Sequence, residues 1–179
     1  MNSLLVVGLG NPGPEYERTR HNIGYMIVDE LAAREHVTLS QHKKTNTFLG
    51  AFKQGATTVA LMRARSFMND SGGPVKAVSQ FYKVPPSNIL VIHDELDRDF
   101  GASDIKLGGG ANGHNGLKSI AKALGTPDFP RLRFGIGRPP GRQEPRSFVL
   151  KPFTKAEQQE LPVAIDEALR VVDDYIRGL

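Results

Sequence analysis

The sequence predicts one α/β domain over residues 1–179, with a mixed β-sheet flanked by helices. Two observations lead to this prediction. Short apolar runs alternate along the chain with segments that carry the 3.6-residue periodicity of helices. The chain also has 179 residues, of which 39% are hydrophobic and 23% charged, a composition typical of one globular domain that closes its own core.

The first half of the chain contains an apolar run, a helical segment and a hairpin. Residues 4–8 are apolar throughout and predict a buried strand. Residues 22–34 predict a helix with Asn22 as its N-cap. Residues 47–53 and 57–62 predict two strands that pair across a tight turn.

The second half continues the alternation of strand and helix. Residues 69–82 predict a helix, and the fully apolar residues 89–92 predict a central strand. Two further strands are expected at 105–107 and 132–136, with a short helix at 116–124 between them.

A long helix is expected over about residues 154–177. Thr154 and Glu157 form the pattern of a capping box at its start. Pro162 lies eight residues further along, and we expect it to restart the helix as a first-turn proline. Residues 139–145 have the composition of a linker but are too few to separate a second domain.

The composition excludes some functions and suggests a partner. The chain has no Cys, which excludes disulfides and thiolate metal sites and is compatible with the cytoplasm. No apolar run approaches the roughly 20 residues of a membrane span. The net charge is +4, and residues 131–146 hold five arginines and one glutamate. An excess of this kind suits a nucleic-acid or phosphate partner, although it also suits a solvated surface.

The stretch LLVVGLGNPG at residues 4–13 has the glycine spacing of a dinucleotide loop. In that fold the helix begins at the glycines, so that its N-terminus faces the pyrophosphate. Here the first helical periodicity begins only near Asn22. An NAD-dependent enzyme is therefore a weak alternative, and we expect the glycines to form a sharp turn that presents Asn11 beyond the strand.

Several polar residues follow predicted strands or open predicted helices: Asn11, Asn69, the run His93-Asp94-Glu95 and the pair His114-Asn115. Together they offer a histidine base, a carboxylate to orient it and neutral amides for an oxyanion. No G-x-S-x-G elbow is present, so hydrolysis by an activated water is expected. Metal-assisted hydrolysis through His21, His93, Asp94 and His114 is an alternative.

Five segments carry a resemblance to a known family: GLGNPGPEYERTRHNIG, FMNDSGGPV, HDELD, KLGGGANGHNGLKS and RLRFGIGRP. In this order they resemble the signature blocks of bacterial peptidyl-tRNA hydrolases over nearly the whole chain. The resemblance implies an α/β/α sandwich with a twisted mixed sheet. It also implies a monomeric cytoplasmic enzyme, without metal, cofactor or obligate protein partner, that cleaves the ester between a peptide and the 3′ ribose of tRNA.

The resemblance also implies roles for individual residues. His21 would be the general base that activates water, Asp94 would stabilise its protonated form, and Asn11 would distinguish blocked from free aminoacyl-tRNA. Further substrate-binding positions would be Tyr16, Phe67, Asn69, His114 and Asn115, and Lys106 and Arg133 would hold the tRNA 5′-phosphate. A tRNA-binding domain of the same fold without hydrolysis is the remaining alternative.

Overall fold

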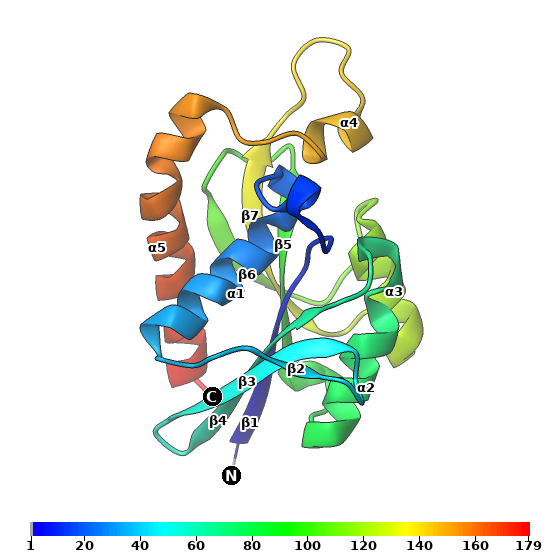
Figure 1. Ribbon diagram of the computed structural model, residues 1–179, viewed down its shortest axis with the longest axis vertical. Coiled ribbons are helices and arrows are strands. Elements are labelled where there is room, and N and C mark those ends of the chain that lie inside the picture. Colours follow the sequence, from blue (N-terminus) through cyan, green and yellow to red (C-terminus); the bar gives the residue numbers. More distant parts are fainter. Residues whose placement is uncertain (1) are drawn as a thin grey trace.

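The computed structural model describes residues 2–179 and contains a seven-stranded sheet in the order β2-β3-β4-β1-β5-β7-β6 (Figure 1). The strands are β1 Asn2–Gly8, β2 Ser40–His42, β3 Thr47–Gln54, β4 Thr57–Ala64, β5 Ile89–Leu96, β6 Ser103–Leu107 and β7 Pro130–Gly137. The helices are α1 Ile23–Arg34, α2 Gly72–Tyr82, α3 Asn115–Leu124, α4 Pro145–Val149 and α5 Lys155–Arg177. Single 3-10 turns are η1 Pro14–Tyr16, η2 Arg20–Asn22, η3 Met68–Asp70 and η4 Pro86–Asn88.

The sheet is mixed, as the sequence predicted. Its centre is parallel, because β1 pairs in parallel with both β4 and β5, and β5 pairs in parallel with β7. Toward the two edges the pairing is antiparallel: β3 pairs with β2 and β4 on one side, and β6 pairs with β7 on the other. The carboxyl ends of the central strands therefore meet at one end of the sheet, where loops can bring side chains together.

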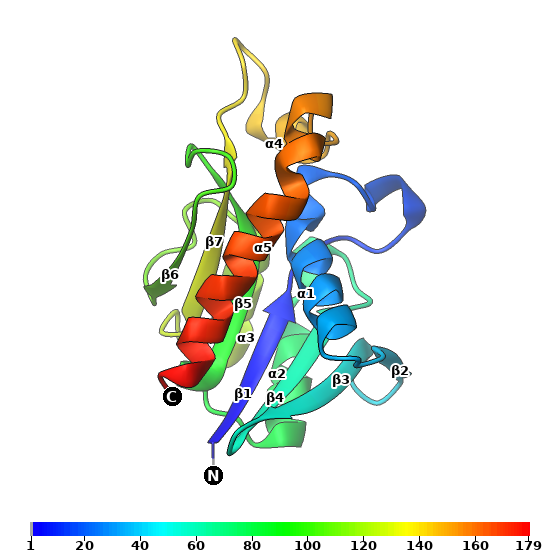
Figure 2. The same ribbon diagram turned by 90° about the vertical axis from the view of Figure 1, so that its left-hand side faces the viewer.

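Helices cover both faces of the sheet, and the pleat divides the core between them. Alternate residues of β1 point to opposite faces: Leu4 and Val6 pack with α1 and α5, while Leu5 and Val7 pack with α2 and α3. Figures 1 and 2 show these two layers on opposite sides of the sheet, so the predicted α/β/α sandwich is confirmed.

The structure corrects some of the predicted elements. The helix expected over 69–82 is divided into η3 and α2. The helix α5 does not restart at Pro162 but runs through it, because the apolar stripe from Leu161 to Ile176 keeps packing against the sheet on both sides of the proline. The short elements β2 and α4 were not expected.

The glycines after β1 allow close packing rather than cofactor binding. A Cβ on Gly8 would lie 2.4 Å from the carbonyl oxygen of Gly24 in α1, and a Cβ on Gly10 would lie 2.7 Å from the ring of Tyr25. In this stretch only Gly13 has a positive φ, of 110°. Since α1 begins at Ile23, well beyond the loop, the helix N-terminus of a dinucleotide site is not formed.

Within residues 2–179, none of the helices combines the length and the apolar character that crossing a bilayer requires.

We expect Gly24→Ala to destabilise the protein by about 3 kcal/mol or more, because the added Cβ would lie 2.4 Å from the backbone oxygen of Ile92 and from the backbone nitrogen of Leu9. The matched control is Gly73→Ala in α2, where nothing lies within 4 Å of the added Cβ and helix propensity favours alanine. Urea unfolding of both variants measures the difference, and equal stabilities would contradict the packing argument.

Candidate active site

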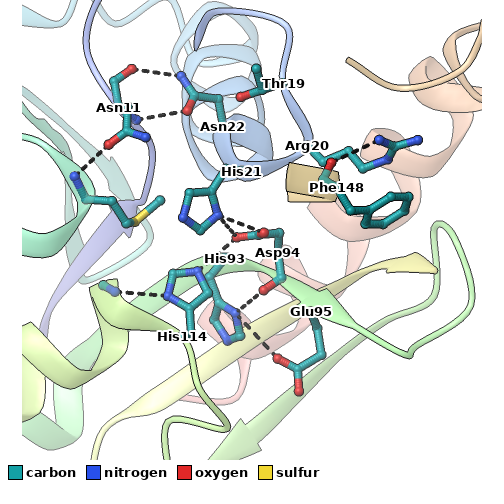
Figure 3. A network of polar contacts seen from close by, with 12 residues as sticks. Asn11, Thr19, Arg20, His21, Asn22, His93, Asp94, Glu95, His114 and Phe148 are labelled. Carbon is teal, nitrogen blue, oxygen red and sulfur yellow. Dashed lines mark hydrogen bonds and ion pairs between the residues drawn. The ribbon is translucent and has the colours of Figure 1, made fainter. Parts of the chain in front are cut away.

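A cleft of about 750 Å³ opens at the carboxyl end of the central strands. Its walls come from the segments that follow β1 and β4, from the last residues of β5, from the start of α3 with the loop before it, and from α4. The lining residues predicted from the sequence are Asn11, His21, Phe67, Asn69, Asp94, His114 and Asn115. The structure therefore brings together most of the predicted site from five separate segments (Figure 3).

His21 and Asp94 form the centre of this cleft. His21 lies in η2, and its Nδ1 is 2.9 Å from Oδ2 and 3.0 Å from Oδ1 of Asp94 near the end of β5. An ionised carboxylate only accepts hydrogen bonds, so Nδ1 carries the proton and donates it. The Nε2 lone pair of His21 is then free to take a proton from water.

His114 binds the same carboxylate from the other side. Its Nε2 is 2.8 Å from Oδ1 of Asp94, and its Nδ1 accepts hydrogen bonds from the backbone N–H groups of Gly116 and Leu117 at 3.1 and 3.4 Å. Backbone N–H groups can only donate, so Nδ1 is unprotonated and Nε2 donates to Asp94. His114 is thus the N-cap of α3.

The electrostatics keep Asp94 ionised. Burial raises the pKa of this carboxyl, but His21 and His114 outweigh burial and hold it below its usual range. The side chain is buried at the bottom of the cleft and accepts from two imidazoles. A charged carboxylate at this point stabilises the positive charge that His21 acquires when it accepts a proton.

His93 supports the site from behind and does not line the cleft. Its Nδ1 donates to the backbone oxygen of Asp94 at 2.8 Å, and its ring packs edge-on against His114 with the centroids 5.1 Å apart. Burial lowers the pKa of His93 to about 3, so the ring is neutral. In the metal alternative this residue was a candidate ligand, but its hydrogen bond directs it to the backbone.

His21, Asp94 and His114 place their ligand atoms within 4.8 Å of one another, as a metal group would. A metal ligand, however, uses the nitrogen lone pair. The nitrogens of His21 and His114 that face Asp94 are both proton donors to it. The arrangement therefore fits a hydrogen-bonded carboxylate better than a metal site.

The backbone of Asn11 is held by a second asparagine, Asn22, which was predicted only as a helix N-cap. The backbone N–H of Asn11 donates to Oδ1 of Asn22 at 2.8 Å, and Nδ2 of Asn22 donates to the backbone oxygen of Asn11 at 2.9 Å. Asn22 was predicted as an N-cap, but it makes no side-chain capping bond to α1. The sequence signal that could have placed Asn22 in the site is its position directly after His21.

The side chain of Asn11 has a defined orientation. Its Oδ1 accepts the backbone N–H of Met68 at 2.7 Å. Because that oxygen is engaged, the amide Nδ2 is the group that Asn11 has left to offer to the cleft. The site therefore presents a fixed N–H donor near His21, suited to a carbonyl oxygen.

The aromatic pair predicted for the substrate lies at the rim. Phe67 is 53% exposed and lines the cleft, and Tyr16 meets it edge-on with the ring centroids 6.0 Å apart. Tyr16 itself does not line the cleft. The cleft is also lined by the apolar residues Leu96, Val149 and Leu150. Val149 and Leu150 were missed because no element was predicted from the sequence between residues 145 and 150.

Lys106 and Arg133 lie outside the cleft, on β6 and β7, and line a separate cavity of about 350 Å³. The cavity shares Glu95 and Asn112 with the cleft. Arg133 already binds Asp104 through two hydrogen bonds of 2.9 and 2.7 Å. A phosphate at this position would therefore compete with a carboxylate.

The five arginines of residues 131–146 do not act as one free basic cluster. Arg131 is buried, Arg133 is paired with Asp104, and Arg138 is paired with Asp97. The sequence count of positive charge thus overestimates what this segment offers to a phosphate.

The fold and the site define a class of enzyme in which a histidine, oriented by a buried carboxylate, activates water for hydrolysis. The family model for peptidyl-tRNA hydrolase matches residues 5–179, and the chain belongs to this family.

Individual relatives agree with this assignment. The chain is 48% identical to the peptidyl-tRNA hydrolase of Mycobacteroides abscessus over 98% of its length and 90% of the relative. It is 53% identical to that of Mycolicibacterium smegmatis, over 92% and 86% of the two chains. The crystal structure of peptidyl-tRNA hydrolase from Acinetobacter baumannii superposes with a TM-score of 0.91 at 41% identity, covering 99% of this chain and 90% of the other.

We expect acid to destabilise the fold in two steps. The pKa of His93 is about 3 in the folded protein against an ordinary 6.5, so below pH 6.5 only the unfolded chain gains this proton, and stability falls as the pH falls. Asp94, whose folded pKa is also lowered, adds a second loss below about pH 4. Urea unfolding from pH 7 to 4 should show a flatter curve for His93→Gln than for the unchanged protein. Parallel curves would mean that His93 is not held neutral by the fold.

Proposed function

We propose that this chain hydrolyses the ester that joins a peptide to the 3′ ribose of tRNA, and so recycles tRNA from aborted translation. The observation that carries the proposal is the His21–Asp94 pair, which faces an open cleft in a chain of this family. A tRNA-binding domain without hydrolysis would have no need of a buried carboxylate that orients a histidine. The hydrolytic function is therefore favoured over that alternative.

The residues of the cleft suggest a reaction without a covalent enzyme intermediate. Nε2 of His21 removes a proton from water, and the resulting hydroxide attacks the ester carbonyl carbon. Asp94 stabilises the imidazolium, and Asn69 and Asn115, which line the cleft, would donate their amide N–H groups to the oxyanion. When the tetrahedral intermediate collapses, the ribose 3′ oxygen leaves and takes the proton from His21.

Asn11 supports selection of blocked substrates. A peptidyl or N-acylated aminoacyl group has an amide carbonyl next to its first residue, whereas a free aminoacyl group has an ammonium there. The fixed Nδ2–H of Asn11 would donate to that carbonyl and would face the ammonium without an acceptor.

The remaining predicted contacts divide between the two ends of the RNA. Phe67, with Tyr16 against its edge, offers a half-exposed ring on which a terminal base could stack. His114 lines the same cleft and donates a hydrogen bond to Asp94. Lys106 and Arg133 would take the 5′-phosphate in the adjoining cavity.

We also propose that residues 1–179 act as one domain and as a monomer in the cytoplasm. His21, Asp94 and Asn11, the residues assigned to the reaction and to selection, line one cleft within this chain, which supports a site that functions in a single copy. The chemistry above requires water and no cofactor. Translation, which supplies the substrate, takes place in the cytoplasm.

The direct test is release of tRNA from N-acetylaminoacyl-tRNA in the presence of EDTA. We expect His21→Ala to lower the rate roughly 10²–10⁴-fold, because it removes the base while leaving RNA contacts in place. Asp94→Asn should lower it less, since the base remains. His42→Gln on β2, outside the cleft, is the matched control. Near-normal turnover by His21→Ala would refute the assignment of the base.

We expect Asn11→Asp to reduce discrimination between N-acetylated and free aminoacyl-tRNA. The variant keeps an oxygen for the N–H of Met68 but replaces the Nδ2 donor, at a cost of about tenfold or more in kcat/KM for the acetylated substrate. Asn46→Asp, in the turn between β2 and β3, controls for the added charge. An unchanged ratio of the two substrates' kcat/KM values would remove Asn11 from selection.

We expect Arg133→Gln to weaken tRNA binding and to lower the slope of log K against log salt by about 1, because one phosphate contact is lost. Arg170→Gln, an exposed arginine on α5, controls for net charge. Binding titrations from 50 to 300 mM salt, roughly the range in which such slopes are measured, provide the comparison. If both variants keep the original slope, Arg133 does not hold a phosphate.

A further inference from the structure

A buried arginine on β7 is surrounded by backbone carbonyls, and among residues 2–179 it forms no ion pair with a carboxylate. Arg131 is 2% exposed, and its Nη2 donates to the oxygens of Gly109 and Pro127 at 2.6 and 2.7 Å. Its Nη1 donates to the oxygen of Gly110 at 2.7 Å, and its Nε to that of Phe129 at 3.4 Å. The guanidinium therefore binds the glycine-rich loop of residues 108–113 to the sheet.

Other contacts of this loop lie at its two ends: the N–H of Gly108 donates to the oxygen of Phe129 at 3.1 Å, and the oxygen of Ala111 accepts from the N–H of His114 at 2.9 Å. Gly108, Gly109, Asn112 and Gly113 have φ values of 75°, 102°, 50° and 81°, a backbone region that is unfavourable for most side chains. Asn112 makes one exposed hydrogen bond of 3.2 Å to Glu95. Two successive loop carbonyls, those of Gly109 and Gly110, accept charge-assisted hydrogen bonds from Arg131 at 2.6 and 2.7 Å.

The loop ends where the catalytic cleft begins. His114 follows it directly, caps α3 through Nδ1 and donates to Asp94 through Nε2. A displaced loop would move the His114 backbone and lengthen the 2.8 Å bond to Asp94. Asp94 would then be held by His21 alone and would orient that base less well.

Arg133 provides a comparison within the same strand. It lies two residues after Arg131, so both side chains emerge on the same face of β7. The side chain of Arg133 is 26% exposed and paired with Asp104, whereas Arg131 is enclosed and binds carbonyls. Both arginines line the cavity of about 350 Å³, but only Arg133 is partly exposed there, whereas the guanidinium of Arg131 is occupied by backbone carbonyls.

We infer that Arg131 is a positioning residue for hydrolysis: it fixes the loop of residues 108–113, and through it His114 against Asp94, and it does not bind an RNA phosphate. This inference rests on the proposed function. It assigns to Arg131 an effect on the chemical step and to Arg133 an effect on RNA affinity.

The kinetic experiment compares Arg131→Met, Arg131→Lys, Arg133→Met and the charge control Arg170→Gln on N-acetylaminoacyl-tRNA over a series of salt concentrations. We expect Arg131→Met to lower kcat by about 10–100-fold, as expected for a displaced catalytic constellation, with KM and its salt dependence unchanged. Arg131→Lys, which can still donate to one or two carbonyls, should recover part of the loss. Arg133→Met should raise KM and flatten its salt dependence.

Amide hydrogen exchange supplies a measurement that does not depend on activity. The N–H groups of Gly116 and Leu117 are bonded to Nδ1 of His114, so a displaced loop should speed their exchange in Arg131→Met, less in Arg131→Lys and not in Arg133→Met. If Arg131→Met fails to fold, the same comparison is made with Arg131→Lys.

Two results would overturn the inference: unchanged exchange at Gly116 and Leu117 in the Arg131 variants, or a loss confined to KM and its salt slope. If the unchanged protein shows no hydrolysis but the exchange pattern holds, then the proposed function fails while the role of Arg131 in holding the loop is supported.

Discussion

The structure depends on one buried negative charge, the carboxylate of Asp94, and on the two imidazoles that donate to it. A buried carboxylate without partners would be expensive and would take up a proton. Here His21 and His114 approach within 3.0 Å from separate segments and keep it ionised. Because each imidazole donates to the same group, each has its tautomer set, and only His21 turns its free nitrogen lone pair to the cleft.

Much of the surrounding backbone can be understood as the support for these two hydrogen bonds. The close approach of Gly8 and Gly24 seats α1 against the sheet, which places η2 and His21 above the end of β5. On the other side, His114 uses one nitrogen to cap α3 and the other to bind Asp94. The helix N-terminus and the catalytic carboxylate are thereby connected through one side chain.

Burial of apolar side chains determines most of the fold, and so most of it could be predicted from the sequence. The strands around residues 4–8 and 89–92 and the helix after Thr154 follow from periodicity and capping, which are local properties. The elements that were missed, β2 and α4, are short: β2 is three residues paired with the start of β3, and α4 packs against η2, far away in the chain. The prediction that the helix restarts at Pro162 was wrong, because tertiary packing along α5 outweighs the one backbone hydrogen bond that the proline removes.

Site residues could be predicted from the sequence where the residue type itself implies the role. They could not be predicted where the role depends on a contact that forms only in the folded chain. His21, Asp94 and Asn11 were expected from residue type and from the family resemblance, and the structure brings them into one cleft. Asn22 was assigned to a cap because only the folded chain shows that Asn11 is its partner. In the same way, Arg131 counted as surface charge until the carbonyls around it were seen.

The tautomers of the two histidines test this account most directly. Nitrogen-15 chemical shifts of the imidazoles, measured at a pH where both rings are neutral, distinguish a protonated from an unprotonated ring nitrogen. The account predicts a proton on Nδ1 of His21 and on Nε2 of His114, the two nitrogens that face Asp94. A proton on Nε2 of His21 would contradict it, because that nitrogen could not then act as the base.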